Sequence, residues 1–167
     1  HDREHFFTRC RPSEQGDKMK KSILILLAFI LAACSAGGSE LSRNQQTWEK
    51  ANISHYRFEL TLSCFCAFNE QMPLTVEVQD GKVVSMAYAD GQAVAADDPL
   101  REYFGKLATI DGLFAELETA MASADAGDII VKYDPSLGFP TEASIDYIKE
   151  AVDDELYVTV AGFEVLP

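Results

Sequence analysis

The sequence predicts an α+β domain: a mostly antiparallel sheet of about six strands that carries two main helices on one face. Residues 55–66 alternate apolar and polar side chains, which is typical of a half-buried strand. Residues 110–121 instead space their apolar side chains as an amphipathic helix does. The predicted order is helix, three strands, helix, three strands. Neither helix can bury its apolar side except against a sheet, so we expect a single domain.

The first helix is predicted from Ser42 to about Ile53. The run from Ser42 to Gln45 has the form of a capping box, in which the first side chain and the fourth satisfy backbone donors of the first turn. Its expected inner face consists of Leu41, Trp48 and Ala51.

The first strand and a hairpin follow. The strand places on its buried face Tyr56, Phe58, Leu60, Leu62, Cys64 and Cys66. Residues 73–88 then predict a hairpin with the three-residue loop 79–81, because that loop pairs Val76 with Val84 and Leu74 with Met86 and gathers the apolar side chains on one face. Gly81 is expected to be left-handed.

The second half begins with one or two helical turns, with Pro99 at their first position and Gly105 at their end. Thr109 then caps the main amphipathic helix. Its apolar positions are Ile110, Leu113, Phe114, Leu117 and Met121. Three more strands are predicted at 128–134, 141–148 and 155–166.

The N-terminal residues predict a targeting segment. Residues 1–18 show no apolar periodicity, and we interpret them as an upstream extension that is not native, with translation starting at Met19. Lys20 and Lys21 then precede an apolar run at 23–33, which is shorter than the roughly 20 residues that span a bilayer. Residues 19–33 therefore predict a signal peptide.

This segment ends in Leu31, Ala32, Ala33 and Cys34, a run that resembles the lipobox of bacterial lipoproteins. The resemblance implies that a signal peptidase recognises the three residues and cleaves before Cys34. It also implies a diacylglyceryl group on the Cys34 thiol and an acyl group on the new amino terminus, which together anchor a chain stably. By analogy with the sorting of Gram-negative lipoproteins, the absence of Asp at the next position, where this chain has Ser35, implies the outer membrane, on its periplasmic face. The alternatives are an uncleaved anchor and an ordinary secretory signal.

Residues 34–40 are expected to form a flexible tether, and residues 41–167 a single periplasmic domain. The net charge of the whole sequence is −13. Residues 1–33 hold six basic and four acidic side chains, which leaves 8 Lys and Arg against 23 Asp and Glu. This charge disfavours nucleic acid and anionic lipid as partners. It attracts a basic partner, although acidic surfaces also serve solubility alone.

Cys64 and Cys66 are the cysteines that remain after Cys10 in the extension and the lipidated Cys34. An even pair in an oxidising compartment predicts a disulfide. Residues two apart in a strand are separated by about 6.6 Å, whereas bonded cysteines need β-carbons about 3.5 to 4.5 Å apart. The bond therefore requires a bulge or the end of the strand. Thiol–disulfide exchange and a metal site remain as alternatives, but His55 lies on the opposite face of the strand.

The segments "TIDGLF", "VKYDPSLGFPTEASIDY" and "DDELYVTV", with Trp48 and "HYRFELTLSCFC" before them, resemble a family of bacterial lipoproteins known as domain of unknown function 6174. The resemblance runs from about Trp48 to Val160. Its most specific parts are the run 133–135 with Gly138 and Pro140, and Cys64-Phe65-Cys66. The family implies a fold but no catalytic residue. It often has an aromatic residue where this chain has Leu137, so an aromatic contact at that position is not carried over.

The run "YDPSLGFP" has two interpretations. The first is turn chemistry, in which Asp134 bonds the backbone and Gly138 permits a left-handed bend. The second is a rigid recognition loop that carries Tyr133, Asp134, Leu137 and Phe139.

We therefore expect a membrane-anchored lipoprotein that is a non-enzymatic binding module for a protein or a small ligand. The alternative is a thiol redox or metal-handling protein that uses Cys64 and Cys66. No catalytic residue, metal or cofactor is expected other than the lipid on Cys34, since the sequence has no nucleophile–base pattern and no phosphate-binding glycine loop. Nucleic acid is not expected as a partner.

Overall fold

The computed structural model describes residues 36–167, with side chains from Glu40 onward. These residues form one antiparallel sheet of six strands with three α-helices, which confirms the predicted α+β class. The extension at 1–18, the signal peptide at 19–33 and the lipidation site at Cys34 lie outside the described residues.

The helices are α2 (Ala36–Ala51), α3 (Arg101–Leu107) and α4 (Ile110–Ala122), with a short 3₁₀ helix η1 (Asn69–Gln71). The strands are β1 (His55–Ser63), β2 (Leu74–Gln79), β3 (Lys82–Ala87), β4 (Ile129–Tyr133), β5 (Pro140–Ile145) and β6 (Leu156–Val165). Their order in the sheet is β3-β2-β1-β6-β5-β4.

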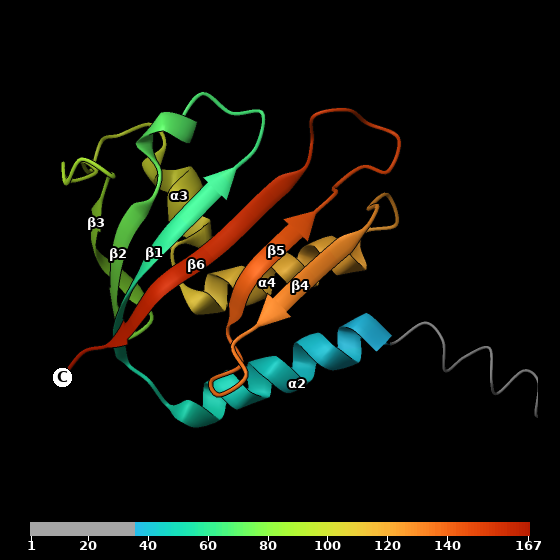
Figure 1. Ribbon diagram of the computed structural model, residues 1–167, viewed down its shortest axis with the longest axis horizontal. Helices are drawn as coiled ribbons and strands as arrows, with labels where there is room; N and C mark the ends of the chain where they lie inside the picture. The colour runs from blue at the N-terminus through green and yellow to red at the C-terminus, as the bar shows by residue number, and fades with distance from the viewer. Residues whose placement is uncertain (1–35) are drawn as a thin grey trace, which may run out of the picture. The chain divides into compact units, whose positions relative to one another are not determined.

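Each half of the domain contributes three consecutive strands, and the two halves join between β1 and β6 at the middle of the sheet (Figure 1). The backbone N–H of Leu166 donates to the carbonyl of His55, which extends this pairing past the end of β6. The first and last strands of the domain are therefore its central pair.

One face of the sheet is the core and the other is open. The four apolar side chains of β1 predicted to be buried are at most 2% exposed. Figure 1 shows α3 and α4 behind the sheet, and α4 buries its apolar stripe there. On the open face, Arg57 pairs with Glu164 and Lys132 with Glu142, both in exposed ion pairs. Alternation along the strands thus separates the two faces as predicted.

Helix α2 begins at Ala36, not after Ser42, so the predicted capping box was wrong and residues 36–40 are helical instead of a tether. The physical reason is that polar side chains of α2 donate hydrogen bonds to backbone carbonyls four residues earlier in the helix. The Asn44 amide donates to the carbonyl of Glu40, and the Thr47 hydroxyl donates to that of Arg43. Residues of this kind can cap a helix, but in α2 they are satisfied inside it and do not mark its start.

The hairpin between β2 and β3 also differs from the prediction. Its loop has two residues, because Gln79 pairs with Lys82, and both Asp80 (φ 50°) and Gly81 (φ 72°) are left-handed. A two-residue turn with both residues left-handed matches the twist of the flanking strands and is a commoner hairpin connection than the three-residue loop that we expected. A register shift beyond Val78 then brings Met86 opposite Val76, so the apolar side chains still reach the core.

Two smaller corrections concern the second half. Gly105 lies inside α3 instead of ending it, and the helix begins at Arg101, two residues after Pro99. Strand β6 is not regular: Gly162 (φ 58°) lies at a register shift against β1. The shift lets both Val160 and Phe163 pack toward the core despite their odd spacing.

Candidate functional site

The predicted lipidation site cannot be placed, because Leu31, Ala32, Ala33 and Cys34 lie outside the described residues. Within residues 36–167, no helix combines the length and the apolar character needed to cross a bilayer.

Cys64 and Cys66 are joined by a disulfide directly after the last residue of β1. Their Cα atoms are 5.1 Å apart. The backbone N–H of Cys66 donates to the carbonyl of Cys64 (2.7 Å), and the Asn69 amide donates to the same carbonyl (3.0 Å). The chain therefore leaves the extended conformation here, which supplies the strand end that a bond between residues two apart requires.

Phe65, between the two cysteines, is the most exposed large apolar side chain of the described residues, at 86%. Its two neighbours are partly buried and pack against the core. The disulfide and the two hydrogen bonds to the Cys64 carbonyl hold the backbone on both sides of the ring. Phe65 is thus presented to solvent by a segment that is itself fixed.

Several segments meet at the same end of the sheet as Phe65. Ser63 at the end of β1 pairs with Tyr157, and Ile145 at the end of β5 pairs with Leu156. The segment after β1 and the segment between β5 and β6 therefore emerge side by side, as the upper part of Figure 1 shows. Helix α3 lies at the same end, because the ring centroid of its Tyr103 is 5.5 Å from that of Phe68 in the segment after β1. We call these three segments (64–73, 146–155 and α3) the loop end, together with the adjoining row of paired residues in the sheet, which runs Ser63, Tyr157, Ser144, Ile130.

Exposed apolar side chains concentrate at the loop end. Eight large apolar side chains of the described residues are exposed, and six belong to this end. They are Phe65, Tyr103, Ile130, Ile148, Val152 and Tyr157. The other two, Val84 and Val165, lie elsewhere in the sheet. Exposed apolar patches are a common feature of interaction sites in proteins, whereas single exposed apolar residues occur on any surface.

The loop end is also acidic. The segment 146–155 has five carboxylates and one lysine, the segment 64–73 has one glutamate and no basic residue, and α3 has one glutamate, one arginine and one lysine. The five carboxylates are Asp146, Glu150, Asp153, Asp154 and Glu155. Asp154 accepts a hydrogen bond from the backbone N–H of Ile148 (2.6 Å), which fixes the loop around one of these groups. The exposed apolar side chains of the loop end are therefore surrounded by negatively charged side chains.

A hollow of about 220 Å³ opens at this end between α3, α4 and the start of the 146–155 segment. It is lined by Tyr103, Lys106, Leu107, Glu116, Tyr147 and Leu156. The two leucines are buried and form its apolar part. The Tyr147 hydroxyl donates to Glu116 Oε1 at 2.5 Å, so one wall joins α4 to the loop after β5.

The surroundings of the hollow raise the pKa of both phenols, chiefly through burial. Burial, with the hydrogen bond to Glu116 as the next cause, raises the pKa of Tyr147 well above its ordinary value. Burial and then the nearby Glu116 charge raise the pKa of Tyr103. No ion pair in the described part of the chain includes Glu116. The hollow therefore offers a carboxylate and two neutral aromatic rings.

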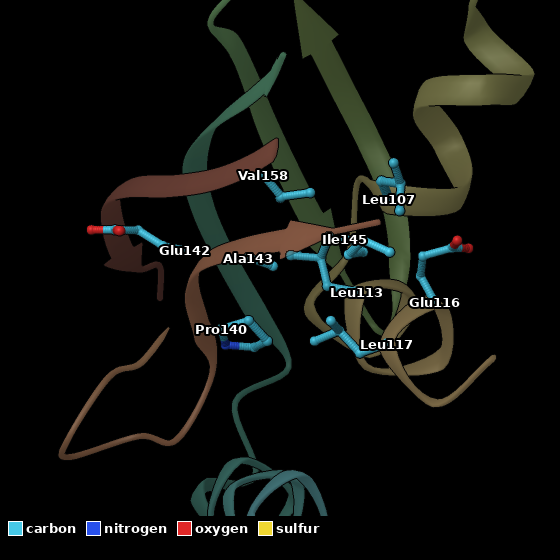
Figure 2. Close-up of a pocket in the computed structure, with 9 residues that line it drawn as sticks. All are labelled: Leu107, Leu113, Glu116, Leu117, Pro140, Glu142, Ala143, Ile145 and Val158. Carbon is cyan, nitrogen blue, oxygen red and sulfur yellow. The ribbon is translucent and has the colours of Figure 1, made fainter. Parts of the chain in front are cut away.

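A second cavity, drawn in Figure 2, is a packing void and not a binding site. It lies between α4 and strands β5 and β6, and its volume is about 10 Å³. Apolar side chains from Leu113, Leu117 and Val158 surround it, while the carboxyl groups of Glu116 and Glu142 point outward on opposite sides (Figure 2). A void of this size and lining does not hold a ligand.

The "YDPSLGFP" run forms a turn that is used internally. Asp134 Oδ1 accepts hydrogen bonds from the backbone N–H groups of Ser136 (2.9 Å) and Leu137 (2.7 Å). Phe139 is 4% exposed and stacks on Phe163, with ring centroids 4.5 Å apart. Tyr133 and Leu137 are partly buried against the core. Burial and then the Glu40 charge raise the pKa of Tyr133 to about 12. These contacts favour the turn interpretation over a recognition loop.

Sequence reasoning missed the hollow altogether. Its polar groups come from three separate segments, and no spacing in the sequence connects Tyr103 with Glu116 or Tyr147. The only available signal was that each of these residues lies next to an apolar residue of a predicted element.

No metal centre is found in the described part of the chain. Within residues 36–167, no cluster of three or more His, Cys, Asp or Glu side chains could hold a metal ion.

The fold and this end of it define a class: an α+β domain whose antiparallel sheet has one open face and one end rich in exposed apolar side chains. The sequence model of one protein family, described as "Family of unknown function (DUF6174)", matches residues 40–165. The chain belongs to this family. No curated protein and no solved structure matches it.

Proposed function

We propose that this protein is a bacterial lipoprotein, anchored through acylated Cys34 at the periplasmic face of the outer membrane, whose domain binds a basic protein partner at the loop end. In this proposal it binds without catalysing a reaction. The observation that carries the binding role is the concentration of exposed apolar side chains at one acidic end of the domain.

The chemistry of the loop end fits a protein partner. Aromatic anchors such as Phe65 supply much of the energy of an interface when a partner removes them from water. Its fixed backbone means that little freedom is lost on binding. The surrounding carboxylates attract a partner with Lys and Arg around an apolar centre and speed its encounter. They also repel anionic lipid, so the same end is kept off the membrane that holds the anchor.

A thiol redox role for Cys64 and Cys66 is the second candidate. It is supported by the position of the disulfide at the loop end, in a short loop whose middle residue, Phe65, is exposed. Metal handling by this pair would first require reduction of the bond, since thiolates are the metal ligands.

The anchor is tested by growing cells that express the wild-type chain or C34S with labelled palmitate. We expect label on the wild type only, with the wild type in the outer-membrane fraction and C34S released from it. Label on C34S, or its retention in the same membrane, would contradict the lipoprotein proposal.

The binding role is tested with a photo-crosslinking amino acid in place of Phe65, and the same amino acid in place of Val84 as the matched control. Val84 is also exposed (51%) but lies in β3, near the hairpin turn at the other end of the sheet. We expect Phe65 to give a defined cross-linked protein in cells, basic in composition, and Val84 to give none. Equal products from both positions, or none from Phe65, would contradict the proposal.

The C64S and C66S double variant separates the two candidates. A binding module keeps its partner when this pair is replaced, with weaker binding because the segment around Phe65 is less restrained, whereas a redox protein loses its activity altogether.

A further inference from the structure

We propose that the hollow formed by Tyr103, Lys106, Leu107, Glu116, Tyr147 and Leu156 receives the cationic end of an arginine or lysine side chain from the bound partner. This inference rests on the proposed function and adds the chemistry of recognition to it. The hollow lies at the loop end, because Tyr103 contacts Phe68 of the segment after β1 and Tyr147 follows β5.

The size of the hollow favours a single side chain over a free metabolite. Sites for small molecules enclose about 300–1,000 Å³, and this hollow has about 220 Å³. A side chain that arrives attached to a partner needs no larger enclosure, because the rest of its binding energy comes from the surrounding surface.

The lining favours a cation with an apolar stem. Leu107 and Leu156 supply the apolar part, against which the methylene groups of arginine or lysine pack. Glu116 is a half-buried carboxylate with one oxygen bonded to Tyr147 and no ion pair among the described residues. A charged donor that bonds this carboxylate forms a stronger hydrogen bond than a neutral donor does. The rings of Tyr103 and Tyr147 add attraction for a cation placed over their faces.

Lys106 is the one lining residue that opposes a cation. It is exposed and takes part in no ion pair of the described region, so its charge is screened by solvent. It therefore weakens the attraction without filling the hollow. Removing this charge should therefore have the reverse effect of removing Glu116: K106M should strengthen the binding of a cation.

The test uses ligand-observed NMR titration of the full chain in detergent micelles. The probe is arginine blocked at both ends (N-acetyl-arginine N-methylamide), and blocked citrulline is its neutral match in shape. We expect arginine to bind roughly tenfold more tightly than citrulline, the difference expected between a charge-assisted and a neutral hydrogen bond. Equal binding of the two probes would overturn the inference.

Variants on α4 locate the binding. E116Q keeps an acceptor for Tyr147 and should weaken arginine binding about fivefold to tenfold. E118Q removes the same charge from an exposed position two residues away and should leave binding unchanged. Y147F should weaken it less than E116Q, and K106M should strengthen it. An equal loss in E116Q and E118Q would show a general effect of net charge and would overturn the inference.

The two proposals fail separately. If a partner cross-links at Phe65 but arginine binds no better than citrulline, the binding role stands. Only the proposal that the hollow receives a cationic side chain is then overturned. An arginine preference that depends on Glu116, with no cross-link at Phe65, overturns the loop end as the partner surface while the hollow stands as a cation site.

Discussion

Two short aromatic loops at opposite ends of the sheet are built from similar parts and used in opposite ways. The loop at 134–139 is fixed by Asp134 and a left-handed glycine, and the loop at 64–66 by a disulfide. Phe139 in the first is 4% exposed, whereas Phe65 in the second is 86% exposed. A rigid loop can therefore bury its aromatic side chain to hold elements together or keep it in solvent, and residue types alone do not say which.

What separates the two loops is the presence of a helix. The loop at 134–139 lies against α2 so closely that a β-carbon on Gly138 would come within 2.4 Å of the Asn44 carbonyl oxygen. Phe139 then packs in an aromatic group with Trp48 of the same helix. No helix of the described residues covers Phe65, which accounts for its exposure.

The largest expected effect comes from F139A. Truncating a buried phenylalanine costs about 3–5 kcal/mol, because the transfer energy is lost and a cavity is left. Urea unfolding of the variant should show this loss of free energy, whereas F139L should lose much less because it keeps most of the volume. A loss below about 1 kcal/mol in F139A would mean that this loop does not hold α2.

G138A should lose about 2–3 kcal/mol, since alanine is strained at φ 79° and its β-carbon meets the backbone of α2. G91A is the matched control. Gly91 has φ 84° but nothing within 4 Å of the added carbon, so it should lose only the conformational cost of about 1 kcal/mol. Equal losses in the two variants would show that the close approach to α2 contributes nothing.

Replacing both Cys64 and Cys66 by serine should cost about 1.6 kcal/mol, the chain-entropy value for a closed loop of three residues. The wild type measured in reductant should fall to the same free energy of unfolding. A double variant as stable as the oxidised wild type would mean that the disulfide does not restrain the segment around Phe65.

Much of the fold could be predicted because its signals are local and repeated. Alternation in β1 and helical spacing in α4 each extend over several residues, and Thr109 caps α4 as expected by accepting from the N–H of Gly112. The six antiparallel strands follow from these patterns and from the short connections between them.

The rest depended on single residues whose effects are not local. A register shift at Gly162 and another beyond Val78 change which side chains face the core, and no periodic pattern marks either. The predicted start of α2 was wrong for a similar reason, because a serine such as Ser42 is tolerated inside an exposed helix as well as at its first position. The exposure of Phe65 could not be predicted, because this residue lies beyond the end of β1, where the alternation of the strand no longer applies.

F65A should have the smallest effect of these substitutions, because Phe65 is held in solvent and is free for a partner. Measured by urea unfolding beside F139A, F65A should stay within about 0.5 kcal/mol of the wild type, as surface substitutions do. A loss of about 1.5 kcal/mol or more would show that the ring packs on the domain, and the loop end would lose its central anchor.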